Sequence, residues 1–186
     1  MAASWMGEAA AAGLFMPTGG RSTQPIGHWE FCQSYPDECV ANEPDATPVK
    51  LTRDLWKIVL EVNTFANASI TPRTDFEMWG REEFWSYPEG YGDCEDYVLE
   101  KRRELIAYGV PASALLVTVV RQSNGDGHAV LTLRTDRGDF ILDNLEARVL
   151  RWFETDYSFL KRQSERSAGA WVSIEDGRAV AVGSVR

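Results

Sequence analysis

Apolar residues recur at helical spacing in two long stretches of this chain. The first stretch follows Thr52, a good N-cap residue, and continues to about Asn67 with an apolar side chain at every third or fourth position. The second stretch runs from Cys94 to Tyr108, and Gly109 ends it. Both patterns predict amphipathic helices that bury one face against the rest of the protein.

Strand patterns follow the second predicted helix. Residues 115–121 are apolar on both faces, which predicts a central strand that is covered on both sides. Residues 128–135 alternate between apolar and polar faces, as a strand does. The turn residues Asp136-Arg137-Gly138 then lead into a further strand over residues 139–143. The last two segments therefore predict an antiparallel hairpin.

The two ends of the chain are less regular. Residues 1–48 are rich in Gly, Pro, Ala and Thr and lack periodicity, so we interpret them as an irregular N-terminal arm on a single domain of residues 49–186. Residues 145–165 are mixed and indicate a short strand followed by a short helix. An Asp-Gly turn between residues 171–174 and 178–182 predicts a final hairpin.

The composition is that of a folded globular protein. The chain has 186 residues, 44% of them hydrophobic, and seven tryptophans, which suits one domain with a proper core. The net charge of −9 and the absence of long basic runs argue against nucleic acid as a partner, whereas the acidic excess suits a cation, a basic substrate or a solvated surface. No apolar run approaches the ~20 residues that a membrane span needs, and no signal peptide is visible in the sequence.

The three cysteines divide into a close pair and a single residue. Cys32 and Cys39 flank a turn-rich spacer, so we expect a disulfide that pins the arm and implies an oxidising compartment. A metal site is the alternative interpretation, with His28 as the one nearby further ligand. Cys94 is left over, and a single cysteine with a distant histidine is a candidate nucleophile.

Cys94 opens the second predicted helix, where the helix dipole favours a thiolate. Lys101 falls on the same helical stripe, so its ammonium must pair or reach towards solvent. A cysteine nucleophile also needs a base, and the chain has two histidines. His28 lies in the arm, whereas His128 opens a strand directly after a glycine-rich turn. His128 is therefore the candidate base, although the same position suits an ordinary strand residue.

Asp143 is the candidate residue that orients His128. If the turn between the two strands is a two-residue loop, the antiparallel register places Asp143 opposite residue 130 or residue 132. Both positions share a face with His128, because side chains alternate with a period of two. A loop of odd length would place Asp143 on the opposite face. A cap at the strand end is the alternative role of this carboxylate, since Asn144 follows it.

Three sequence blocks resemble a known family. Residues 92–97 read Gly-Asp-Cys-Glu-Asp-Tyr, residues 127–131 read Gly-His-Ala-Val-Leu, and residues 142–145 read Leu-Asp-Asn-Leu. They are similar to the bacterial transglutaminase-like cysteine proteinases, and the resemblance spans about residues 23 to 175. Further similar positions lie upstream: Val62-Asn63, Asp75, Trp79-Gly80 and Trp85-Ser86-Tyr87-Pro88.

The resemblance implies a papain/transglutaminase-like α+β fold, in which a Cys-bearing helix packs on an antiparallel β-sheet. It assigns Cys94 as nucleophile, His128 as general base and Asp143 as the residue that orients the base. Such a triad makes a cysteine peptidase that works through an acyl-enzyme thioester. The reaction also needs an oxyanion hole, for which the backbone N–H of Cys94 and the side chain of Asn63 are candidates.

The resemblance also suggests an ion, a substrate and a compartment. The best-studied members are calcium-dependent periplasmic proteases that release a large adhesin from the cell surface. We therefore expect Ca²⁺ and no organic cofactor, a protein substrate such as a surface adhesin, and a periplasmic or secreted location. The expected calcium ligands are Asp93 and Glu95, with Asp96 as a third. A helix capping box formed by Asp93 and Asp96 is the alternative role of these carboxylates.

Two other functions are compatible with the same residues. In a transglutaminase or amidase, an amine replaces water at the step that releases the acyl group, and the triad is unchanged. A non-catalytic binding module of the same fold is the third hypothesis. The presence of Cys94, His128 and Asp143 together argues against that module.

Overall fold

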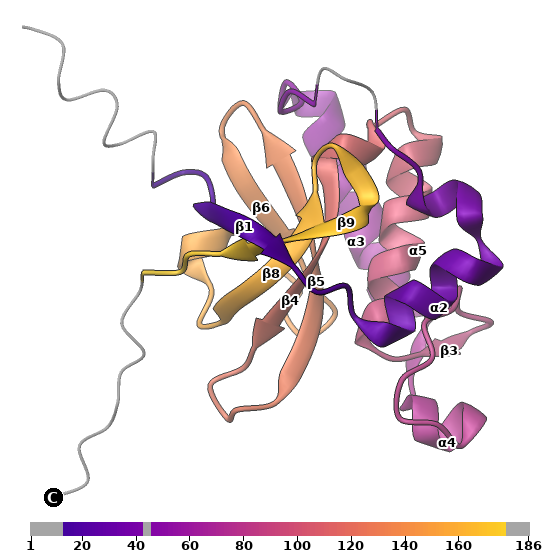
Figure 1. Cartoon of the computed structure of the whole chain (residues 1–186). Coiled ribbons are helices and arrows are strands. Elements are labelled where there is room, and N and C mark those ends of the chain that lie inside the picture. The colour runs from indigo at the N-terminus through magenta and orange to yellow at the C-terminus, as the bar shows by residue number, and fades with distance from the viewer. Residues whose placement is uncertain (1–12, 43–45, 178–186) are drawn as a thin grey trace, which may run out of the picture.

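The computed structural model describes residues 13–42 and 46–177 (Figure 1). Its centre is an antiparallel sheet of seven strands in the order β1-β9-β8-β4-β5-β6-β7. The strands are β1 (Thr18–Ser22), β4 (Leu115–Arg121), β5 (Gly127–Thr135), β6 (Gly138–Leu142), β7 (Leu150–Arg151), β8 (Ser158–Ser164) and β9 (Ser167–Ile174). The segment 178–182, one strand of the predicted final hairpin, lies outside the described residues.

The α-helices lie on one side of this sheet (Figure 1). They are α2 (Ile26–Ser34), α3 (Arg53–Ser69), α4 (Asp75–Trp79) and α5 (Cys94–Ala107). Three single-turn 3-10 helices connect other elements: η1 (Pro36–Cys39), η2 (Ala112–Ala114) and η3 (Trp152–Glu154). A small parallel pair, β2 (Thr71–Pro72) and β3 (Tyr91–Gly92), precedes α5. None of the helices among residues 13–42 and 46–177 is long and apolar enough to span a membrane.

The two long helices form where the apolar periodicity predicts them. Thr52 caps α3, because its side chain accepts a hydrogen bond from the N–H of Leu55 at 3.1 Å. The helix α5 ends before Gly109, whose positive φ of 88° suits glycine. The main core fills the space between these helices and the sheet, and its fully buried members include Val59, Leu105, Leu115, Val117, Leu131, Leu133 and Leu142.

The other face of the sheet carries a smaller core. Trp152 of η3 and Met16 cover this face, and the indole N–H of Trp152 donates to the carbonyl of Gly13 at 3.2 Å. The strand residues beneath them are Val120, Val130, Ile141, Phe159 and Ile174. The central strands are thus covered on both faces, as the apolar run over residues 115–121 predicts.

Several irregular-looking segments form regular elements, which corrects the sequence analysis. The arm contains the edge strand β1 and the helix α2, although its sequence has no periodicity. The strand β1 pairs with β9 through its backbone and needs no apolar face, since its sequence is Thr-Gly-Gly-Arg-Ser. Residues 145–165 contain the short strand β7 followed by the single-turn helix η3, as expected, but they also include most of the strand β8, in which buried Arg162 and Gln163 disturb the alternation.

Candidate functional site

Cys94 is the first residue of α5, and it follows Asp93 in an extended conformation. The half-buried thiol lines a cavity of about 400 Å³ that His128 also lines. Cys94 Sγ donates to Glu95 Oε2 at 2.9 Å. Burial first, and the Glu95 carboxylate second, raise the pKa of the Cys94 thiol well above its usual value. In this state the sulfur therefore carries its proton.

His128 and Asp143 meet as the two-residue loop predicts. The loop is Asp136-Arg137, because Thr135 pairs with Gly138, and the same register sets Leu131 opposite Leu142. One step further, position 143 lies opposite position 130, which shares a face with His128. His128 Nε2 lies 2.8 Å from Asp143 Oδ1, and both side chains are buried.

Two further groups hold the Asp143 carboxylate. Its Oδ1 also accepts from the N–H of Leu145 at 3.0 Å, and its Oδ2 accepts from the hydroxyl of Tyr157 at 2.5 Å. Burial acts to raise the pKa of Asp143, but the hydrogen bonds from His128, Leu145 and Tyr157 outweigh it and the pKa lies below its usual value. The carboxylate is therefore kept ionised beside the imidazole. Sequence reasoning missed Tyr157, which lies just before β8 and has no motif around it.

Asn63, the expected side-chain partner in an oxyanion hole, lies elsewhere. It is buried in α3, and its Nδ2 donates to the carbonyl of Ala147 at 3.2 Å. It is not among the residues that line the cavity beside Cys94. Cys94 and His128 thus line one cavity, whereas the Asn63 amide contacts the segment that follows β6.

Three carboxylates gather beside the first turn of α5. Asp75 at the start of α4, Asp93 and Asp96 each offer an oxygen within 4.8 Å of the others. The N–H of Phe84 donates to Asp75 Oδ2, and the N–H of Ser86 donates to Asp96 Oδ1 at 2.9 Å. Their other oxygens, and Asp93 Oδ1, are buried without a hydrogen-bond partner among the described residues.

These carboxylates are costly to ionise without a counter-charge. Burial first, and the neighbouring carboxylates next, raise the pKa of Asp93 to about 8 and that of Asp96 to about 8. Burial also raises the pKa of Asp75. Buried, unpaired carboxylate oxygens that point towards one another are the ligands Ca²⁺ prefers, so the cluster fits such an ion.

The group that the structure brings together shares two residues, Asp93 and Asp96, with the ligand set expected from the sequence. The structure places Asp75, not Glu95, together with Asp93 and Asp96. Asp93 and Asp96 are three positions apart at the start of the helix. Glu95 is not in this group, although its side chain is hydrogen-bonded to that of Asp93 and accepts from Cys94. Asp93 occupies the N-cap position but makes no side-chain cap hydrogen bond, so the capping box is also absent at α5.

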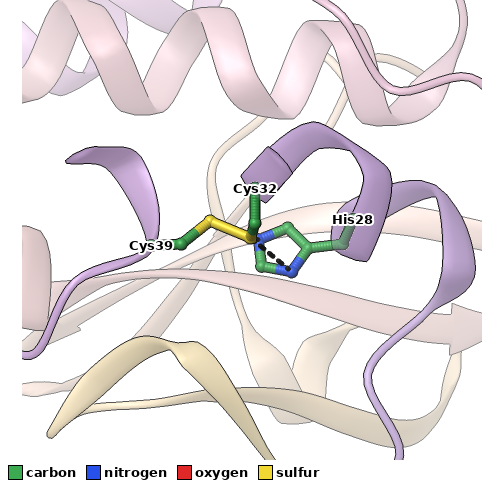
Figure 2. Close-up of side chains that lie close together, drawn as sticks. All are labelled: His28, Cys32 and Cys39. Carbon is green, nitrogen blue, oxygen red and sulfur yellow. Dashed lines mark hydrogen bonds between the residues drawn. A yellow bond between two sulfur atoms is a disulfide. The ribbon is translucent and has the colours of Figure 1, made fainter. Parts of the chain in front are cut away.

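Cys32 and Cys39 form the expected disulfide, with a Cα–Cα distance of 5.6 Å. Figure 2 shows His28 beside this bridge, with its ring nitrogens 3.8 and 3.9 Å from Cys32 Sγ. Burial first, and Arg102 second, lower the pKa of His28 to about 4, so the ring is neutral. The Trp171 indole N–H donates to His28 Nδ1 at 3.2 Å. Because the cysteines are bonded to each other, they are not metal ligands in this state.

Comparison with known proteins gives a family and a fold. A family model described as bacterial transglutaminase-like cysteine proteinase (BTLCP) matches residues 18–179. A solved structure of Legionella pneumophila LapG is 28% identical, with 63% of this chain and 68% of that chain covered and a TM-score of 0.54. No curated protein matches.

Two further LapG structures from Legionella pneumophila are similar. The EGTA-treated protein is 26% identical over 66% of this chain and 68% of that chain, with a TM-score of 0.55. The calcium-bound protein is 24% identical over 75% and 77%, with a TM-score of 0.52, and at that identity the likeness concerns the fold. Both likenesses agree with a helix layer packed on an antiparallel sheet.

Proposed function

The chain belongs to the bacterial transglutaminase-like cysteine proteinases, and from this premise we propose that it is a cysteine endopeptidase with the triad Cys94, His128 and Asp143. The observation that carries the proposal is the buried contact of 2.8 Å between His128 Nε2 and Asp143 Oδ1. This contact supports an imidazole whose orientation is fixed beside the cavity that also contains Cys94.

The chemistry follows from the two ring nitrogens of His128. Because an ionised Asp143 accepts from Nε2, that nitrogen carries the proton of the neutral ring and Nδ1 is the free base. In the proposed reaction the Cys94 thiol turns from Glu95 to His128 and transfers its proton to Nδ1. The sulfur then attacks the peptide carbonyl and forms a tetrahedral oxyanion.

Collapse of this oxyanion breaks the C–N bond. The imidazolium of His128 donates its proton to the leaving amine, and the acyl group stays on Cys94 as a thioester. Water then attacks the thioester while His128 accepts its proton, and the returning proton restores the thiol. The backbone N–H of Cys94, which has no partner within the helix because Cys94 is the first residue of α5, is the proposed donor to the oxyanion.

We propose that Asp75, Asp93 and Asp96 hold a Ca²⁺ ion. Their unpaired buried oxygens support this ligand set, and so do the calcium-bound and EGTA-treated structures of LapG. When bound, the ion supplies positive charge next to the first turn of α5, which offsets the carboxylates that disfavour a thiolate at Cys94. It also fixes the segment 84–86 against that turn, because Asp75 and Asp96 hold both ends of it.

We further propose a protein substrate at the bacterial surface or in the periplasm, such as an adhesin. A proteinase family implies a protein substrate. The Cys32–Cys39 disulfide supports an oxidising compartment, since such bridges are rare in the cytosol. The adhesin itself is inferred from the resemblance to the LapG-type proteases.

The test is hydrolysis of a disordered protein substrate by the protein and by Cys94→Ala. The variant is expected to lose at least about 1,000-fold in kcat, because no other group replaces the nucleophile. Circular dichroism checks that it is folded, which is expected since removal of one half-buried thiol changes little packing. Hydrolysis by Cys94→Ala at the original rate would overturn the proposal. An added amine donor that is incorporated without release of new amino termini would instead identify an acyl transferase.

A further inference from the structure

Asp143 directly follows β6, so its backbone is not paired with another strand. The pairing of β5 with β6 ends at Leu131 and Leu142, and residues 143–149 form neither helix nor strand. The carboxylate of Asp143 nevertheless meets His128 at 2.8 Å. Because the segment 143–149 makes no strand pairing, other hydrogen bonds must hold it if Asp143 is to stay in contact with His128.

Two asparagines of α3 supply these hydrogen bonds. Asn67 Nδ2 donates to the carbonyl of Asp143 at 2.8 Å, and Asn63 Nδ2 donates to the carbonyl of Ala147 at 3.2 Å. The two asparagines are four positions apart, so they lie on one face of the helix, one turn from each other. Both ends of the segment 143–147 are therefore attached to the same rigid element.

Two further hydrogen bonds hold the side chain of Asp143. Leu145 N–H and the hydroxyl of Tyr157 both donate to the carboxylate. With the carboxylate held by these two groups and the main chain held by Asn67, the position of Asp143 relative to β5 depends on α3. A shift of this segment would lengthen the contact between Asp143 and His128.

We propose that Asn67, assisted by Asn63, is a positioning residue that holds Asp143 in hydrogen-bond contact with His128. The proposal rests on the proposed function, because it assigns a role in the same triad. Neither asparagine touches the cavity beside Cys94, and each acts through the backbone of the segment 143–147. The sequence suggests Asn63 only as an oxyanion candidate, whereas its hydrogen bond to the carbonyl of Ala147 supports this different role.

The chain offers a matched control for a merely structural effect. Asn42 Nδ2 donates to the carbonyl of Glu165 at 2.9 Å, and its side chain is half-buried like that of Asn67. Asn42→Ala therefore removes the same kind of hydrogen bond from a segment that does not contact Asp143. Any general loss of stability is expected in both Asn42→Ala and Asn67→Ala.

The experiment compares kcat, KM and the proton NMR spectrum of the two variants and of Asn63→Ala. We expect kcat of Asn67→Ala to fall by about 10- to 100-fold with little change in KM, because a small displacement of a catalytic group has effects of this size. Asn63→Ala should show a smaller loss, and Asn42→Ala none. The downfield Nε2–H proton of His128, which reports its bond to the carboxylate, should move only in Asn67→Ala and Asn63→Ala.

Equal kcat and an unchanged His128 resonance in Asn67→Ala and Asn42→Ala would overturn the inference. If Asn67→Ala does not fold, Asn67→Asp takes its place, since it keeps the shape but turns an acceptor towards the Asp143 carbonyl. The same two readouts then decide, and an unchanged resonance with full kcat again overturns the inference. Cys94→Ala in the same assay separates the two proposals: activity in that variant refutes the peptidase, whereas inactive Cys94→Ala with normal Asn67→Ala refutes only the positioning role.

Discussion

Lys101 is a lysine in an apolar, buried environment. The sequence places it on the buried stripe of α5, where it was expected to pair or to reach solvent, and it does neither. Its side chain is fully buried, and Nζ has no hydrogen-bond partner among the described residues. The ring of Tyr97 is 5.9 Å away. Burial lowers the pKa of Lys101 to about 7, although Asp143 acts in the opposite direction.

Replacement of this lysine should change how stability depends on pH. Between pH 7 and about 10.4 the unfolded chain binds a proton at Lys101 that the folded protein does not, so wild-type stability rises with pH across this window. Lys101→Met removes that dependence, on the order of 1 kcal/mol per pH unit. The variant is therefore expected to gain most over the wild type below pH 7 and least near pH 10.

Urea unfolding at pH 6, 8 and 10 measures this effect. Lys57→Met is the matched control, since Lys57 is 76% exposed on α3 and should give a curve parallel to that of the wild type. Parallel curves for Lys101→Met and the wild type would mean that the buried ammonium titrates normally.

Individual site residues differ in how far the sequence reveals them. Cys94 and His128 could be predicted because the chain has only three cysteines and two histidines, and Asp143 because the period-two register links it to His128. Tyr157, just before β8, and Asn67 of α3 reach Asp143 through contacts that no local pattern encodes. Sequence spacing therefore does not predict a site residue whose contact joins two elements that are distant in the chain.

At the scale of elements, regular structure could be predicted where the apolar residues follow a helix or strand pattern. The helices α3 and α5 and the hairpin of β5 and β6 follow the apolar periodicity. The helix α2 does not, because its buried face includes Gly27 and His28 beside Phe31. A Cβ at Gly27 would lie 2.4 Å from Trp85, so this face is set by close contact and not by hydrophobic residues.

The turn between α4 and α5 behaves as a single element built around three carboxylates. Asp75 and Asp96 hold the segment 84–86, and Gly92 allows the close approach of Asp96, whose Oδ2 would lie 2.9 Å from a Cβ at that position. In the ion-free protein Asp93 and Asp96, with pKa values of about 8, keep protons that the unfolded chain loses near pH 4. Stability without calcium should therefore fall as the pH rises from about 4 to 8.

Calcium should remove this loss, because it binds the ionised carboxylates. At a concentration 100-fold above its Kd at pH 8, calcium is expected to stabilise the folded protein by about 3 kcal/mol. The same concentration should stabilise less at pH 5, where protons compete for the carboxylates. Melting temperatures with Ca²⁺ and with EGTA at both pH values measure this difference. Asp75→Asn and Asp96→Asn should weaken binding at least about 10-fold, whereas Glu95→Gln should leave it nearly unchanged. Loss of the calcium effect in Glu95→Gln alone would restore the ligand set expected from the sequence.

At the scale of the whole molecule, the N-terminal arm is joined to the body that carries the site. The strand β1 extends the sheet at β9, and the ring of His28 packs against Trp85 and Trp171 with centroid distances of 5.3 Å. Trp85 lines the cavity beside Cys94. Next to the disulfide, Glu38 forms an ion pair of 2.8 Å with Arg102 of α5. The arm therefore contacts both α5, which begins with Cys94, and the wall of the cavity.

The disulfide fixes this connection, so its removal should destabilise the protein as a unit. Cys32 and Cys39 are seven positions apart, and closing such a short loop stabilises a fold by about 2 kcal/mol. Urea unfolding of the double variant Cys32→Ala/Cys39→Ala should show a loss of this size, with Glu38→Gln as the control that removes only the charge facing Arg102.

Protein isolated without reductant from the periplasm and then unfolded should give one titratable thiol, Cys94, and three after reduction. Three thiols before reduction would contradict both the bridge and the oxidising compartment, and unchanged stability in the double variant would show that the arm is held by its packing and its ion pair alone.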